Sequence, residues 1–217
     1  MKCLNDIYLF ENKELMDKMV RWSLYTLFGL LIILPALLLL LSKILTGDWF
    51  FYTESISSIG YILWSGCTVI LCIIIFLAHE LIHGLFFLLL GPRDIHILFG
   101  HDFSHGVLYA TAPRVVYPWY SFIAILLAPT ICISLVCIAV GIWSGWWVCA
   151  LVSFALHLCG CSGDWVFVEQ IVQAHQEGCN CVMDTKDGIA LLHHDAQDVA
   201  LPYCLSAQQE RYIRNLS

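Results

Sequence analysis

The stretch FLAHELIHGLFFLLLGP, residues 76–92, places two histidines and a glutamate inside a run that is otherwise typical of a lipid-buried helix. Each ionisable side chain in such a helix costs on the order of a few kcal/mol. His79, Glu80 and His83 therefore need a partner that offsets this cost. The apolar run extends from Tyr61 to Leu90, and a Gly-Pro pair follows it as a normal helix terminator.

The composition of the whole chain is that of an integral membrane protein. Of its 217 residues, 60% are hydrophobic and 12% are charged, whereas soluble domains average about 25% charged residues. The formal charge of −7 says little about nucleic acid, because the acidic residues lie mostly at the two ends, but the lack of a basic cluster leaves no case for nucleic-acid binding. The first 15 residues are too polar for a secretory signal peptide. Most of the 11 cysteines lie in apolar runs, where cysteine acts as a small hydrophobe.

We therefore expect an all-α polytopic membrane protein with about four transmembrane helices, each near the ~20 residues that span a bilayer. The second helix is Tyr61–Leu90, and a proline lies inside the first and the third. The other three are expected at Trp22–Leu45 with a kink at Pro35, at Trp119–Ile142 around Pro129, and from Gly145 through Cys159 and onward.

Two segments outside these helices predict β-structure. Residues 94–112 lack a helical period, and IHILF and GVLYATA flank a polar turn, which predicts a β-hairpin between helices two and three. Such backbone survives at membrane depth only when protein covers it or it lines a wet cavity. VMDTKDGIALL, residues 182–192, predicts a small cytosolic β-element.

Lysines and arginines predict the orientation. They precede the first span, lie between spans two and three, and follow span four, with Lys43 as the exception. Because cytosolic loops carry the excess of these residues, both termini are expected in the cytosol. The expected location is a bacterial cell membrane.

His79-Glu80-Leu81-Ile82-His83 matches HExxH. On a helix, residues four apart share one face, so the two imidazoles can bind one Zn²⁺. The glutamate beside the first histidine can act as the general base on water. In a soluble helix the motif is often an ordinary polar face, but the apolar surroundings favour a metal. The alternative is a polar cluster that packs against other helices.

A catalytic zinc usually takes three protein ligands. His79 lies ~27 Å into the second span, and Asp164 lies ~28 Å into the fourth, which runs in the same direction. Equal depth favours Asp164 as the third ligand, and His157 is expected as a cavity group or a hydrogen-bonded interior histidine. The remaining candidates are Glu169, the hairpin residues His96, His101 and His105, and the distal His175, His193 and His194.

Two further patterns leave alternatives open. The pairs Cys159/Cys161 and Cys179/Cys181 could hold a structural zinc, although CxC spacing is poor for one and chance pairing is favoured. His101, Asp102 and His105 could reach the mouth of the metal site from the hairpin, or could form a solvated turn.

The chain resembles a family of zincin peptidases of unknown function that is related to the site-2 intramembrane metalloproteases. AHELIHGLFF, the hairpin, the proline-containing third span and SGDWVF carry this resemblance, which covers about residues 60–190. It implies zinc at His79, His83 and Asp164, with Glu80 as the general base. The implied activity is hydrolysis of peptide bonds in membrane-embedded substrates.

On this interpretation, residues 1–21 are a cytosolic tail with a short interfacial helix, residues 22–175 are the membrane metalloprotease core, and residues 176–217 are a second cytosolic tail. The expected partners are a transmembrane protein or peptide substrate and the lipid bilayer. A membrane metal-binding or transport protein is the alternative, although the apolar helix above His79 argues against a through-path. An inactive relative that binds helices in the pocket is a third possibility.

Overall fold

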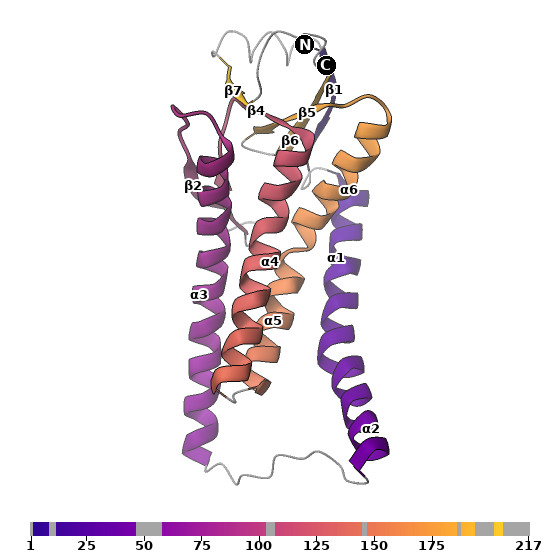
Figure 1. The fold of residues 1–217 in the computed structure, drawn as a ribbon, viewed down its shortest axis with the longest axis vertical. Coiled ribbons are helices and arrows are strands. Elements are labelled where there is room, and N and C mark those ends of the chain that lie inside the picture. Colours follow the sequence, from indigo (N-terminus) through magenta and orange to yellow (C-terminus); the bar gives the residue numbers. More distant parts are fainter. Residues whose placement is uncertain are drawn as a thin grey trace.

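A computed structural model describes residues 2–8, 12–46, 58–102, 107–144, 147–185, 188–193 and 202–205. Long helices run side by side, and a sheet lies at one end of them (Figure 1). In chain order the elements are β1 (Lys2–Ile7), α1 (Lys13–Phe28), the π-helical η1 (Gly29–Ile33), α2 (Leu34–Thr46), α3 (Ser58–Leu90), β2 (Leu98–Asp102), β3 (Val107–Thr111), β4 (Val115–Pro118), α4 (Trp119–Ser144), α5 (Trp147–Gly160), α6 (Ser162–Gln176), β5 (Cys181–Thr185), β6 (Gly188–His193) and β7 (Tyr203–Cys204).

Within the described ranges, three helical stretches are long and apolar enough to cross a membrane: Lys13–Leu37, Ser65–Leu90 and Trp119–Trp143. A fourth crossing is available if α5 and α6 count as one bent span. The mostly helical fold with three to four candidate spans agrees with the sequence-based expectation. The predicted interfacial loop at 46–60 falls largely outside the described residues.

The predicted fourth span is not continuous. α5 ends at Gly160, α6 begins at Ser162, and their axes differ by 44°. Glycine weakens a helix because it lacks a side chain and is conformationally free, and the sequence Gly-Cys-Ser-Gly lies at this break. Asp164 consequently lies in the first turn of a separate helix rather than deep inside a straight one.

The predicted hairpin is present as β2 and β3, which pair antiparallel from Leu98↔Thr111 to Asp102↔Val107. It packs against α3, where Gly84 leaves room for it. A Cβ atom on Gly84 would lie 2.6 Å from the ring of Phe99. This close approach places the hairpin directly beside the HExxH segment, while the turn that holds His105 lies outside the described residues.

The expectation of an all-α fold missed a five-stranded sheet in the order β1-β6-β5-β4-β7. The predicted β-element at 182–192 supplies β5 and β6. The N-terminal segment was expected as a tail with a short helix, yet Lys2–Ile7 forms a strand that pairs antiparallel with β6. The partner of β1 lies at the other end of the sequence, so no local pattern indicates the pairing.

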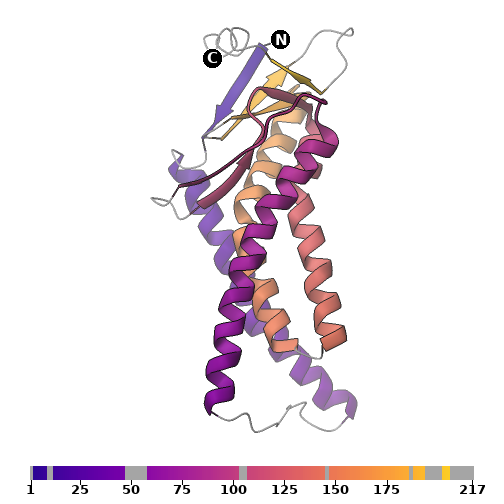
Figure 2. The same cartoon turned by 90° about the vertical axis from the view of Figure 1, so that its left-hand side faces the viewer.

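The sheet caps the helix ends through one hydrophobic core. Tyr117 of β4 and Phe122 of α4 are almost fully buried, and their rings contact Phe87 near the end of α3. Figure 2 shows the sheet lying across the same end of the bundle from a second direction. On the other flank, Lys18 of α1 forms an ion pair with Glu169 of α6.

Candidate metal centre

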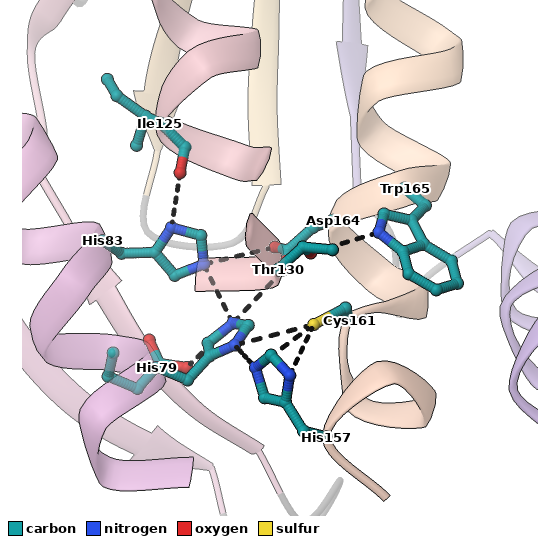
Figure 3. A network of polar contacts seen from close by, with 9 residues as sticks. His79, His83, Ile125, Thr130, His157, Cys161, Asp164 and Trp165 are labelled. Atoms are coloured by element: carbon teal, nitrogen blue, oxygen red, sulfur yellow. Dashed lines mark hydrogen bonds and ion pairs between the residues drawn. The ribbon is translucent and has the colours of Figure 1, made fainter. Parts of the chain in front are cut away.

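Three side chains from two separate helices converge inside the bundle (Figure 3). His79 and His83 lie one turn apart on α3 and are 7% and 6% exposed. Their Nε2 atoms are 3.0 Å apart. Asp164 of α6 places Oδ2 3.3 Å from Nε2 of His79 and Oδ1 3.5 Å from Nε2 of His83. The structure thus brings together the three residues that the sequence analysis selected as zinc ligands.

A proline in the facing helix fixes the orientation of His83. Nδ1 of His83 lies 3.1 Å from the carbonyl oxygen of Ile125 on α4. Pro129 lies four residues later in the same helix and has no N–H, so it cannot make the usual helical bond to that carbonyl. Since a carbonyl only accepts, the proton of neutral His83 lies on Nδ1. Its bare Nε2 therefore points at His79 and Asp164.

These groups fit a zinc ion. The carboxylate oxygen Oδ2 of Asp164 is buried and has no hydrogen-bond partner in the described part of the chain. It faces imidazole nitrogens, so electron-rich atoms converge where only a cation or a proton can satisfy them. In a tetrahedral site with Zn–N and Zn–O bonds of ~2.0–2.1 Å, the ligand atoms stand roughly 3.3 Å apart. The separations of 3.0 Å between the two Nε2 atoms and 3.3 Å between His79 Nε2 and Asp164 Oδ2 agree with that value, and the second carboxylate oxygen, Oδ1, lies 3.5 Å from His83 Nε2.

Glu80 lies beside the three converging residues. Its Oε1 is 3.9 Å from Nε2 of His79, and its side chain is partly exposed. The backbone of Ala110 in β3 is within hydrogen-bonding reach of this carboxylate. The hairpin therefore lies next to the group that the motif assigns to proton transfer.

A second group shares His79. Nε2 of His157 lies 3.1 Å from Nδ1 of His79, and Sγ of Cys161 lies 3.5 Å from the same His157 nitrogen. The sequence analysis placed His157 near the site but treated Cys161 only as part of a CxC pair. The spacing of four residues between His157 and Cys161 was a signal for a shared face.

The other sequence-predicted candidates lie elsewhere in the described part of the chain. Glu169 pairs with Lys18, His175 stacks on Trp119, and His193 bonds to the carbonyl of Gly178. His96 and His101 are exposed. His105 and His194 lie outside the described residues.

The four cysteines of the CxC pairs do not form one group. Cys159 donates to the carbonyl of Ser23, Cys161 faces the histidines, and Cys179 donates to the carbonyl of Cys181. Within the described part of the chain, two groups of side chains could hold a metal: His79/His83/Asp164 and His79/His157/Cys161.

Comparison with known proteins gives one family. A family model described as "Putative zincin peptidase" matches residues 72–179, about half of the chain. The matched range contains every residue of the two groups above. No curated protein and no solved structure matches the chain.

Proposed function

We infer that the chain belongs, through residues 72–179, to a family of zincin peptidases, which implies zinc as its cofactor. From this premise we propose that it is a zinc-dependent endopeptidase that cleaves peptide bonds of membrane-embedded substrates. The observation that carries the proposal is the convergence of both HExxH histidines with Asp164 inside a bundle of apolar helices.

The position of the site along α3 supports a location within the membrane. Counted from the ends of the apolar stretch Ser65–Leu90, His79 lies ~21 Å from one end and ~17 Å from the other. Large apolar side chains cover the outer faces of α3 and α4 around this level, among them Leu77, Leu81, Ile131 and Leu135. Such a surface suits lipid, so a substrate would approach the site from within the bilayer.

The proposed roles follow from the geometry. His79, His83 and Asp164 hold the metal, and the Asp164 carboxylate offsets part of its charge. Zinc, when bound, supplies Lewis acidity toward a peptide carbonyl and toward water. Glu80 takes a proton from the attacking water and returns it to the leaving amine.

The hairpin is the proposed docking element for the substrate. In the described structure, β2 and β3 form a two-stranded sheet, so each strand keeps an edge on which an extended peptide can pair. Because β3 lies next to α3 and its Ala110 backbone reaches Glu80, a strand bound there would pass close to the metal. A transmembrane substrate would have to unwind locally to pair in this way.

Replacing Glu80 with glutamine tests the mechanism. The amide cannot accept the proton of the attacking water, so we expect cleavage of a model transmembrane substrate to fall at least ~100-fold. Zinc content should stay near one ion per chain, because Glu80 is not among the proposed ligands. His79→Ala should lose both zinc and activity, and exposed Glu177→Gln is the matched control. Wild-type cleavage by the Glu80→Gln variant would contradict the mechanism.

A further inference from the structure

We infer that His157 is a positioning residue that holds His79 in the orientation and tautomer needed to bind zinc. This inference rests on the zinc site proposed above. It concerns a histidine of α5 that is completely buried and contributes no atom to the group formed by His79, His83 and Asp164.

The contact lies on the far side of the His79 ring. Nε2 of His79 faces His83 and Asp164, whereas its Nδ1 lies 3.1 Å from Nε2 of His157 (Figure 3). A neutral imidazole that binds a metal through Nε2 carries its proton on Nδ1, and that N–H needs an acceptor.

His157 is the acceptor that suits this N–H. In the described structure Nδ1 of His79 also lies 3.9 Å from Sγ of Cys161, but a thiol is a weak acceptor. Accepting through Nε2 places the proton of His157 itself on Nδ1. The two zinc-facing histidines are therefore held by different acceptors, a backbone carbonyl for His83 and a neutral imidazole for His79.

A neutral acceptor also suits the charge of the site. Metal-ligating histidines often donate to a carboxylate. Here Asp164 and Glu80 already supply two negative charges, which balance one divalent zinc ion. A third buried carboxylate would leave an uncompensated charge in an apolar bundle, which is costly. His157 provides the lone pair without adding that charge.

The break between α5 and α6 makes this arrangement possible. His157 precedes the break and Asp164 follows it, so consecutive helices reach opposite sides of the His79 ring. His79 is thus held from both sides by a single bent segment. The same segment keeps Cys161 against the edge of His157.

Two conservative variants separate hydrogen bonding from packing. The side-chain oxygen of glutamine can occupy the position of histidine Nε2, whereas that of asparagine reaches only to the position of Nδ1. We expect His157→Gln to keep zinc affinity within about threefold of wild type. His157→Asn should lower it about 10- to 100-fold, the usual effect of losing such a partner.

Zinc affinity would be measured by chelator competition on the full chain in detergent, together with the absorption spectrum of the Co²⁺-loaded protein. Ser153→Ala is the matched control, because Ser153 is a buried polar residue one turn earlier on α5 whose hydroxyl has no hydrogen-bond partner in the described structure. The zinc affinity of the Ser153→Ala variant should equal that of wild type. If His157→Asn does not fold, His157→Met gives the same comparison, because methionine fills the space without a nitrogen or oxygen acceptor.

Three results would overturn the inference. One is wild-type affinity in the asparagine or methionine variant. Another is an equal loss in the glutamine and asparagine variants, which would indicate packing alone. The third is two zinc ions per wild-type chain with one lost in both His157→Asn and Cys161→Ser, since His157 would then be a ligand. None of these readouts depends on cleavage, so failure of the peptidase proposal in the Glu80→Gln test is a separate outcome.

Discussion

At the residue scale, the two histidines of α3 show how one imidazole serves two partners. Each directs Nε2 toward the same point and uses Nδ1 as a donor to a group on another helix. The Nε2 atoms face the proposed metal position, and the Nδ1 atoms fix the orientation of the two rings. Removing the imidazole of His157, or supplying a competing donor to the Ile125 carbonyl, should therefore alter metal binding although neither change removes a ligand.

A buried carboxylate outside the helical spans gives a prediction about pH. Burial raises the pKa of Asp184 in β5 to about 6, compared with about 3.9 for an ordinary aspartate. The folded state then holds a proton that the unfolded state releases between about pH 4 and 6. The free energy of unfolding should fall by up to about 3 kcal/mol as the pH rises through this window, and stay level above it.

Asp184→Asn should remove this pH-dependent fall and make the protein more stable than wild type above pH 6. The amide oxygen can still accept from the N–H of Ala112, which lies 2.8 Å from the Asp184 carboxylate. Unfolding would be followed in detergent from pH 4 to 8, with exposed Asp94→Asn as the control. If the free energy of unfolding changed with pH in the same way for wild type and Asp184→Asn, the prediction would be contradicted.

The side chains of the site could be selected from the sequence because ionisable residues are rare in apolar runs. The spacing of HExxH puts two imidazoles on one face, and the depth counted along an assumed continuous fourth span selected Asp164, although that span is broken just before it. The Ile125 carbonyl could not be predicted as the hydrogen-bond partner of His83, because every residue has a backbone carbonyl whatever its side chain. Its availability depends on Pro129, which the sequence shows, and on the packing of α4 against α3, which it does not.

At the element scale, α4 lacks a backbone hydrogen bond at Pro129. Pro129 leaves the Ile125 carbonyl without its helical donor, and His83 fills that role. Pro35 is the second residue of α2 and follows the π-helical segment η1, so it lies where one helical segment gives way to the next. Only the interruption in α4 adjoins the candidate metal centre, so the two prolines form a natural pair for comparison.

Pro129→Ala should change helix stability and zinc binding in opposite directions. Alanine favours the helix by up to ~3 kcal/mol over proline, so the metal-free protein should melt at a higher temperature. The new N–H would compete with His83 for the Ile125 carbonyl, and zinc affinity should fall roughly 3- to 10-fold, less than when a partner is removed outright.

Thermal unfolding and chelator competition on the same preparation would measure both effects. Pro35→Ala should stabilise the helix without altering zinc affinity. A Pro129→Ala protein that binds zinc as tightly as wild type would show that sharing this carbonyl has no cost.

Local patterns predicted the long helices and the hairpin, because apolar length and turn residues are local signals. The break in the fourth span was not predicted, since its apolar run continues into SGDWVF without a proline. The strand β1 was also missed. Six residues without a regular alternation of polar and apolar side chains do not indicate a strand until β6 offers them an edge.

At the scale of the whole molecule, the sheet joins segments from both ends of the sequence. β1 pairs with β6, and β7 pairs with β4 on the opposite edge. Both lie at one end of the bundle, beyond the helix ends (Figure 1). If the helices cross a membrane, this arrangement requires both end segments to lie on the same side of it.

Reporter fusions test this topology. Green fluorescent protein fused before residue 1 or after residue 217 should fluoresce, because both ends are proposed to be cytosolic. Alkaline phosphatase inserted between Thr46 and Ser58 should be active, because that connection joins α2 to α3 at the opposite end of the helices. Opposite results for the two terminal fusions would be incompatible with a shared sheet.

The pairing of β1 with β6 also has a consequence for biosynthesis. The first strand leaves the ribosome with its partner still about 180 residues of translation away. In the described structure β6 is its one neighbour in the sheet, so β1 must remain unpaired while every helix between them is synthesised. The cap over the helix ends is thus completed only when the emerging chain has delivered β6, after all the helices of the described structure have been synthesised.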